Sequence, residues 1–269
     1  MKPAGTRVKP DTKVRLSKWD PDDTGILGKE KNGARARLVE HGTRLETLQE
    51  LLYAEGKHKL LIVLQAMDTA GKDSTIRHVF RGVDPLGVRV TCFKAPTPRE
   101  LSRDFLWRVH QHVPGAGEIG IFNRSHYEDV LITRVNGWID AAECKRRYRQ
   151  INDFERMLTE TGTTILKFYL HISKDEQKKR LEARRDTPEK QWKFLPDDLV
   201  VREQWDDYMK AYEAALSATS TAHAPWHVIP ANSKLARNLM VSSLLIAALE
   251  KLKMRYPRPA NGVAGTQIV

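Results

Sequence analysis

The chain has 269 residues, of which 41% are hydrophobic and 29% charged, a composition typical of soluble globular proteins. Its 45 Lys and Arg exceed its 34 Asp and Glu, so the formal net charge is +11, which either serves solubility alone or favours a polyanionic partner. Two cysteines are too few for a disulfide framework, and the first residues lack the apolar stretch of a signal peptide. No apolar run is long enough to cross a bilayer, so we expect a cytoplasmic protein with no membrane contact.

The first part of the chain predicts an arm followed by a helix. Residues 1–32 carry Pro, Gly, Asp and Lys with little periodicity, which predicts an extended arm. From Ala34 to Tyr53, leucines recur at helical spacing, which predicts a long amphipathic helix. At the other end, residues 257–269 predict a disordered tail. The residues between, 33–256, are expected to form one domain.

Short apolar runs inside that domain predict buried strands. The run LLIVLQ at 60–65 is continuous, contains β-branched residues and ends at a turn with glycine. Similar runs occupy 88–95, 119–125, 164–172 and 226–231. Helical patterns separate them, and in one of these Leu101, Phe105 and Val109 share a face. The alternation predicts an α/β fold with a parallel five-stranded sheet flanked by helices.

The loop after the first strand, residues 66–74, has the sequence AMDTAGKDS and approaches the phosphate-binding pattern GxxxxGK[ST]. Gly71 lets the backbone approach phosphate oxygens, and Lys72 adds a positive charge at the start of a helix, where N–H groups attract anions. The neighbouring Thr69 and Ala70 belong to the same candidate phosphate-binding loop. A strand–turn–helix junction with an incidental Gly-Lys pair is the alternative.

Two positions of this loop depart from the pattern. Ala66 replaces the first glycine, and Asp73 stands where a hydroxyl residue usually holds Mg²⁺, with Ser74 one place later. A carboxylate at position 73 changes how a metal would be held, so Asp68 becomes the better candidate for Mg²⁺ or its waters.

A second polar cluster, NRSHYED at 123–129, follows the third predicted strand. Ligands of open parallel sheets bind beyond the carboxyl ends of the strands, so this cluster should face the phosphate loop. Asn123 and Arg124 are candidates for phosphate binding, since arginine grips phosphate in bidentate fashion. Glu128 and Asp129 can bind a metal, orient a nucleophile or hold a nucleotide. Capping of a helix N-terminus is their alternative role.

A third, basic cluster runs from 173 to 194. Arg180 and Arg184 are four residues apart and share one helix face. In a phosphoryl-transfer enzyme such a segment, about 174–205 here, can form a helical lid that brings Arg and Lys, including Lys190 and Lys193, onto the transferring group. A solvated charged helix is the alternative.

Taken together, these segments resemble the second family of polyphosphate kinases, whose P-loop kinase fold is similar to that of thymidylate kinase. The resemblance covers about residues 5–256. It rests on MDTAGKD (67–73), FKAPTPREL and DFLWRVHQ (within 93–111), FNRSHYEDV (122–130), KQWKFLPDDL and WDDY (within 190–208), and APWHVIPAN (224–232).

The resemblance implies site residues and a metal. Asp68 and Lys72 match the family's essential phosphate-loop pair, Asn123 and Arg124 match its second motif, and Lys94 falls in its phosphate- or nucleotide-binding segment. Asn123 stands where some members have Asp. The resemblance also implies a requirement for Mg²⁺, with Mn²⁺ as an alternative. The lid cations are Arg180, Arg184, Lys190 and Lys193.

The resemblance implies a reaction and partners as well. The reaction is reversible transfer of the terminal phosphoryl group of inorganic polyphosphate to adenine or guanine nucleotides. Glu128 in the sequence YE resembles the subgroup that uses both AMP and ADP, whereas NRSxYN is typical of members limited to diphosphates. A homo-oligomer, dimer or tetramer, is expected, without nucleic acid.

Two other functions are compatible with parts of the sequence. An ATP-dependent nucleotide or nucleoside kinase of related fold would share the phosphate loop and the lid. A non-enzymatic nucleic-acid-binding protein would explain the charge, but the chain lacks an aromatic-rich binding strand and a recognition-helix motif.

Overall fold

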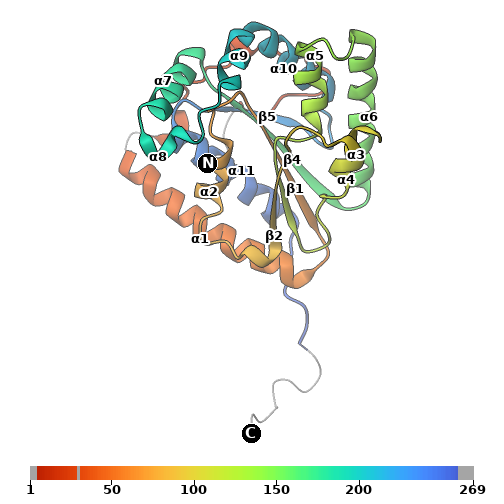
Figure 1. Ribbon diagram of the computed structural model, residues 1–269. Helices are drawn as coiled ribbons and strands as arrows, with labels where there is room; N and C mark the ends of the chain where they lie inside the picture. Colours follow the sequence, from red (N-terminus) through yellow and green to blue (C-terminus); the bar gives the residue numbers. More distant parts are fainter. Residues whose placement is uncertain (1–4, 29–30, 260–269) are drawn as a thin grey trace.

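The computed structural model describes residues 5–28 and 31–259. At its centre lies a five-stranded sheet with the strand order β2-β3-β1-β4-β5, in which every neighbouring pair is parallel (Figure 1). The predicted α/β class and parallel sheet are therefore confirmed, with each strand within a few residues of its predicted ends. The strands are β1 (Lys59–Gln65), β2 (Val88–Cys92), β3 (Ile119–Asn123), β4 (Thr163–His171) and β5 (Trp226–Pro230).

Helices cover both faces of the sheet. The α-helices are α1 (Lys31–Glu55), α2 (Lys72–Val79), α3 (Pro98–Leu101), α4 (Trp107–His110), α5 (Ile132–Val135), α6 (Ala141–Glu160), α7 (Lys174–Arg185), α8 (Pro188–Gln191), α9 (Asp197–Glu203), α10 (Trp205–Thr219) and α11 (Lys234–Lys251). Short 3₁₀ helices are η1 (Leu16–Lys18), η2 (Gly25–Leu27), η3 (Pro85–Gly87) and η4 (His126–Val130). On one side α11 packs against α1 and α2, and on the other α6 packs against β4, η4 and α10 (Figure 1).

The register of the sheet determines which loops meet. Leu64, near the end of β1, is aligned with Asn123 of β3, and Cys92 of β2 is aligned with the same Asn123. The loop after β1 and the polar segment after β3 therefore leave the sheet side by side. This juxtaposition follows from the parallel pairing of the strands, of which β1 and β3 are buried along most of their length, with Leu60–Leu64 almost fully enclosed.

The N-terminal arm is bonded to the domain over its described part. Val8 N donates to Trp226 O at 2.9 Å and Val228 N donates to Thr6 O at 2.8 Å, so residues 6–8 run antiparallel beside β5. Further along, Leu16 N donates to a carboxylate oxygen of Glu213 on α10. Most of the predicted disordered tail, residues 260–269, lies outside the described residues.

One expected helix is wrong. The face shared by Leu101, Phe105 and Val109 predicted a continuous helix, but the structure has two short helices, α3 and α4. Thr97 caps α3, while Asp104 Oδ1 accepts a hydrogen bond from Leu106 N at 3.0 Å and forms a turn between the two helices. Leu101 is consequently 68% exposed and contributes little to the core.

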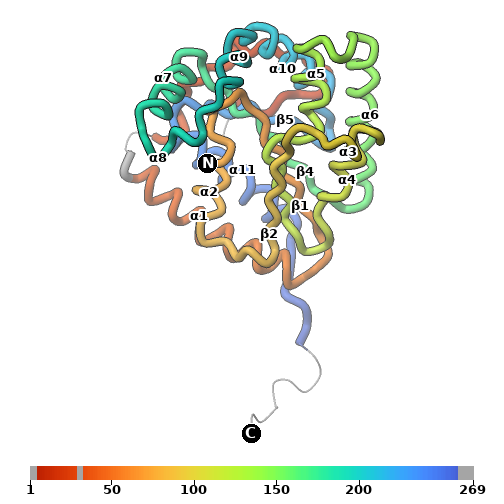
Figure 2. Tube along the Cα trace, in the orientation of Figure 1, coloured from red at the N-terminus to blue at the C-terminus, as the bar shows by residue number. Residues whose placement is uncertain are grey.

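The segment predicted as a lid forms α7, α8 and α9. The trace in Figure 2 shows these helices beyond the carboxyl ends of the strands, at the same end of the sheet as the loop that leads into α2. Among the helices of residues 5–28 and 31–259, none combines the length and apolar character needed to cross a membrane.

Candidate active site

The loop from β1 to α2 is a tight backbone turn. Thr69 and Gly71 both have positive φ angles, 66° and 105°, and α2 begins at Lys72. A Cβ atom at position 71 would collide with Nη1 of Arg237, so only glycine fits there. The first N–H groups of α2 have no partner within the helix, which makes this end attractive to anions. The buried hydroxyl of Thr69 also lacks a hydrogen-bond partner among the described residues.

Lys72 is buried within this loop. Its side chain is 9% exposed and curls back so that Nζ donates to Ala66 O at 3.0 Å. Burial lowers the pKa of Lys72, although the nearby carboxylate of Asp68 opposes the change. Within the described residues no carboxylate lies within ion-pair distance of Nζ. An ammonium group held in this way is best stabilised by an anion that enters the loop.

Asp68 and Arg124 form an ion pair across the site. Arg124 follows β3 with a φ of 61°, and its Nη2 donates to Asp68 Oδ1 at 2.9 Å. Burial would lower the pKa of Arg124, but the carboxylates of Glu128 and Asp68 outweigh burial and raise it, so the guanidinium stays charged. The left-handed backbone at Arg124 is uncommon for a residue with a side chain, as befits a functional position.

Asp73, which replaces the expected hydroxyl residue, is held by Asn123. The Asn123 amide donates to Asp73 Oδ1 at 2.7 Å. Burial alone would raise the pKa of Asp73, but this hydrogen bond and the charge of Lys72 lower it, so the carboxylate remains ionised. The two sequence motifs, one after β1 and one after β3, are thus joined directly.

The two acidic residues of η4 lie differently. Glu128 lies among the loop residues, close enough for the charges of Arg124 and Lys72 to act on its carboxylate. Burial outweighs these charges and raises the pKa of Glu128. Its Oε1 accepts a hydrogen bond at 2.9 Å from Gln65 when that amide is turned with its nitrogen towards Glu128. Asp129 instead faces Arg147 of α6, at 3.9 Å, and burial raises its pKa to about 6.

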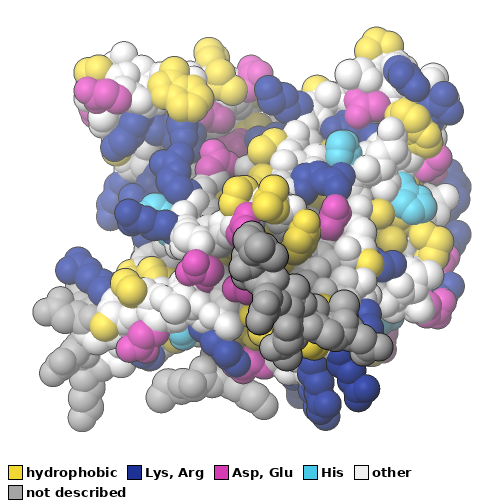
Figure 3. Space-filling model, turned by 90° about the horizontal axis from the view of Figure 1, so that it is seen from below, with side chains coloured by type: hydrophobic (Ala, Val, Ile, Leu, Met, Phe, Trp, Pro, Cys, Tyr) yellow, Lys and Arg dark blue, Asp and Glu magenta, His cyan; other side chains and the backbone are white. Residues whose placement is uncertain are grey.

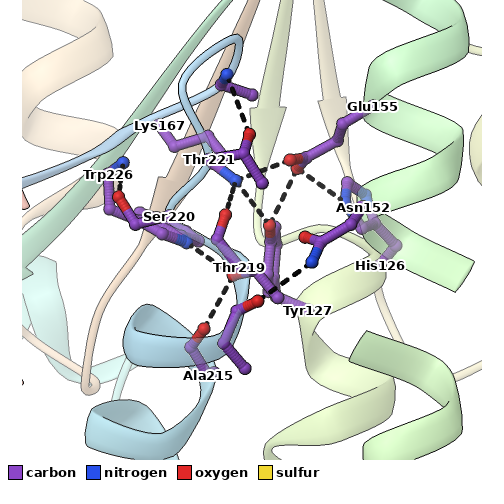
Figure 4. Close-up of polar contacts among 12 residues, drawn as sticks. His126, Tyr127, Asn152, Glu155, Lys167, Ala215, Thr219, Ser220, Thr221 and Trp226 are labelled. Atoms are coloured by element: carbon purple, nitrogen blue, oxygen red, sulfur yellow. Dashed lines mark hydrogen bonds and ion pairs between the residues drawn. The ribbon is translucent and has the colours of Figure 1, made fainter. Parts of the chain in front are cut away.

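A buried polar network lies behind η4 and was not foreseen from the sequence (Figure 4). Lys167 of β4 donates to Glu155 of α6 at 2.6 Å, to Tyr127 Oη at 2.8 Å and to Thr219 O at 2.7 Å. Burial works to raise the pKa of Glu155, but Lys167 outweighs burial and keeps the carboxylate ionised. Because Tyr127 adjoins Glu128, the network fixes the segment that carries the second motif. A lysine inside the apolar run of β4 was the available signal.

The predicted lid cations do not form one group. Arg180 is tied down, since its guanidinium donates to the carbonyls of Thr69 and Ala70 at 3.1 Å and to those of Ala231 and Asn232 at 2.7 and 2.8 Å. The other lid cations lie further along the segment. Arg184 lies 3.5 Å from Asp198, Lys193 stacks on Trp192, and Lys190 is exposed. The charges of Arg184 and Lys193 both help to lower the pKa of Asp73.

The remaining predicted residues flank the loop. Ser74 faces away from it, towards α11, where its Oγ accepts a hydrogen bond from Arg237 at 3.2 Å. Lys94 follows β2 with its side chain exposed, and its carbonyl accepts a hydrogen bond from Arg108 at 2.7 Å. A cavity of about 570 Å³ opens elsewhere, between α5, α6 and α10, and none of the predicted site residues lines it.

The residues at the loop suit a hard cation that is shared with a phosphate ligand. No cluster of three or more His, Cys, Asp or Glu in the described chain makes a complete protein cage. Mg²⁺ rarely needs one, since it usually takes one or two carboxylates together with phosphate oxygens and waters. The hydrogen bond from Arg124 engages Oδ1 of Asp68, which leaves Oδ2 for such an ion or its waters.

Comparison with known proteins places these residues in a familiar context. The family model "Polyphosphate kinase 2 (PPK2)" matches residues 28–257. The chain is 58% identical to the AMP/ADP-polyphosphate phosphotransferase of Meiothermus ruber, over 94% of this chain and 95% of that one. It is 46% identical to the ADP-polyphosphate phosphotransferase of Rhodopseudomonas palustris, over 93% and 91% of the two chains.

A solved structure agrees with this likeness. The crystal structure of polyphosphate kinase 2 from Arthrobacter aurescens TC1 superimposes with a TM-score of 0.94 at 51% sequence identity, covering 98% of this chain and 94% of that one. The sequence-based resemblance and the P-loop kinase-like fold are both confirmed.

Proposed function

The chain belongs to the polyphosphate kinase 2 family, and from that membership we propose a polyphosphate:nucleotide phosphotransferase that accepts both AMP and ADP. The observation that carries the assignment to this site is the meeting of two motifs: the phosphate loop with its buried Lys72, and the Asn123–Arg124 pair bonded to Asp73 and Asp68. Two cations stand where a phosphate would enter: Lys72, held by Ala66 O, and Arg124, held by the carboxylate of Asp68.

The proposed reaction breaks a terminal P–O–P bond of polyphosphate as an oxygen of the acceptor's terminal phosphate forms a new bond to that phosphorus. The shortened chain leaves with the bridging oxygen. Such transfers need positioning and charge neutralisation more than covalent participation by the protein. Lys72 and the N–H groups at the start of α2 would hold the transferring phosphoryl group, and Arg124, oriented by Asp68, would bind its neighbour.

We also propose Mg²⁺, or Mn²⁺ in its place, as the metal. Asp68 would hold it together with phosphate oxygens, and Glu128 is a further carboxylate at the same site. When bound, the ion supplies neutralisation of phosphate charge. The role of Glu128 in the choice between AMP and ADP belongs to the same proposal. Its place beside Arg124 and Lys72 supports this role, as does the likeness to the AMP/ADP-polyphosphate phosphotransferase of Meiothermus ruber.

On the face shown in Figure 3, Lys and Arg side chains gather in several separate patches. We propose a cytoplasmic homo-oligomer, dimer or tetramer, that works without a nucleic-acid partner and runs in both directions.

A substrate panel tests this function. The protein is incubated with Mg²⁺ and polyphosphate together with AMP, ADP, GMP or GDP, and the products are separated by chromatography. We expect ADP and ATP from AMP, and ATP from ADP. Products that arise only when a nucleoside triphosphate replaces polyphosphate would support the rival ATP-dependent kinase instead. Product from ADP alone, with AMP inert, would restrict the proposal to diphosphates.

A further inference from the structure

Arg237 is a buried cation behind the phosphate loop, and no motif in the sequence points to it. It lies on α11, and its side chain is fully enclosed. Its Nη1 donates to Ala70 O at 3.0 Å and its Nη2 to Ser74 Oγ at 3.2 Å, while Asn238 Oδ1 accepts from Nε and Nη2. Within the described residues these partners are neutral and no carboxylate pairs with it. Burial and the nearby Arg180 lower the pKa of Arg237 to about 9.

Burying an arginine without an acidic partner is costly, so the arrangement needs a compensating anion or a structural reason. Its position behind the loop supplies the structural reason. The guanidinium lies directly behind Gly71, so close that any Cβ at that position would collide with Nη1. Arg237 and Gly71 are therefore matched: only the residue without a side chain lets the cation approach the loop.

Two arginines hold the same carbonyl group. Arg180, from α7, donates to Ala70 O at 3.1 Å, and Arg237, from α11, donates to it at 3.0 Å. The peptide between Ala70 and Gly71 is planar, and in a trans peptide the C=O and N–H bonds point in opposite directions. Fixing Ala70 O towards the two guanidinium groups thus turns the N–H of Gly71 away from them, to the open side of the loop.

We propose that Arg237 is a positioning residue for phosphoryl transfer, which fixes the peptide of Ala70 and Gly71 so that the loop presents its N–H groups to the transferring phosphate. The inference rests on the proposed function and adds a residue that contacts no substrate. Arg237 also places a positive charge directly behind the anion site. Arg180 shares the role from the lid side through its bond to Ala70 O.

The test compares Arg237→Lys and Arg237→Met with the wild type and with a matched control, Arg44→Lys. Arg44 also contacts α11, through an exposed ion pair with Glu250 at 2.8 Å, and lies outside the site. Three quantities are measured: the melting temperature without ligand, the kcat and KM for ADP phosphorylation by polyphosphate, and the Kd for inorganic triphosphate by calorimetry. Activity is expressed per folded molecule at a temperature well below every melting transition.

Lysine keeps the charge but cannot bond Ala70 O and Ser74 Oγ as a fork, so Arg237→Lys should lower kcat by about ten- to a hundredfold, the effect of a lost charge-assisted hydrogen bond. The KM for ADP should change less than about threefold, because Arg237 does not contact the acceptor. Arg237→Met, which also loses the charge, should weaken triphosphate binding by about tenfold or more. Arg44→Lys should match the wild type.

The inference is overturned if Arg237→Lys, folded and stable, keeps its kcat within about twofold of the wild type. It is also overturned if both variants bind triphosphate normally and lose only melting temperature, which would make Arg237 an ordinary core residue. Should Arg237→Met fail to fold, Arg237→Lys decides alone. If wild-type protein makes no ATP from polyphosphate, the proposed function fails, whereas the triphosphate titrations still test the loop.

Discussion

Asn123 Nδ2 donates to Oδ1 of Asp73 at 2.7 Å, and this bond joins the end of β3 to the start of α2. It gives a reason for the departure of the loop from the usual pattern, in which a hydroxyl residue would stand at position 73. The carboxylate is held in one orientation and kept ionised by this hydrogen bond and by the charge of Lys72, so it can bind the waters of a metal.

Replacing Asn123 with Ala should impair activity and change its pH dependence. The amide lowers the pKa of Asp73, so its loss moves that pKa upwards, and the acidic decline of kcat/KM should begin at a higher pH than in the wild type. At neutral pH we expect a loss of about tenfold, as for one hydrogen bond to a charged group. The check is a pH profile of ATP formation, with the exposed Asn136→Ala as control. Superimposable profiles would contradict this role for Asn123.

Replacing Lys72 with Met should raise the stability of the protein and lower its activity. Burial of the ammonium lowers the pKa of Lys72 in the folded protein, so the charged side chain reduces the free energy of unfolding at neutral pH. This cost shrinks as pH rises from the lowered pKa of the folded state towards the ordinary pKa of lysine. The variant should gain about 1 kcal/mol or more in unfolding free energy without ligand. It should lose at least about a hundredfold in kcat. Urea denaturation and steady-state assays measure the two effects. A variant that is both less stable and fully active would refute the account of the loop.

Glu155 and Lys167 should be strongly coupled. Because both are fully enclosed, removing one leaves a buried charge, and Glu155→Gln or Lys167→Met should each cost about 3 kcal/mol or more in unfolding free energy. The double variant should cost much less than the sum of the two. Lys210→Met, which breaks an exposed pair with Asp207, should cost under about 1 kcal/mol. Additive costs in the double-mutant cycle would show that the pair does not act as a unit.

Two lid lysines, the exposed Lys190 and the half-buried Lys193, should govern affinity for polyphosphate through their charge. Polyphosphate carries about one negative charge per unit, so its binding should weaken steeply with salt. Replacing Lys190 and Lys193 with Ala should raise the KM for polyphosphate and flatten its dependence on NaCl, while the KM for ADP stays within about twofold. The control is Lys178→Ala, on the outer face of α7 with its side chain 63% exposed. An unchanged salt slope in the double variant would remove these lysines from the polyphosphate path.

The sheet was predictable from the sequence because its central strands are apolar runs, and a continuous run such as LLIVLQ predicts a buried strand. The loop motifs were predictable because parallel strands bring their carboxyl ends together. The break between α3 and α4 was missed because periodicity at Leu101, Phe105 and Val109 says nothing about a turn made by Asp104.

The least predictable residues act on the backbone or in the core. Arg180 was expected to swing with a lid, yet it bonds four carbonyls that no sequence pattern identifies. Arg237 belongs to no sequence motif, because its partners are a carbonyl and a hydroxyl from a loop more than 150 residues away. Lys167 of β4 pairs with Glu155 of α6, a partner whose proximity only the folded chain reveals.

The most direct measurement follows the donor. Purified protein is mixed with ADP, Mg²⁺ and polyphosphate of defined length, with no nucleoside triphosphate, and ATP is measured by luminescence while polyphosphate length is followed by electrophoresis. Parallel reactions omit polyphosphate, or use Lys72→Met. The account predicts one ATP for each phosphate unit removed, none without polyphosphate, and almost none with the variant. ATP formed from ADP alone, or formed while the polyphosphate stays at full length, would contradict it.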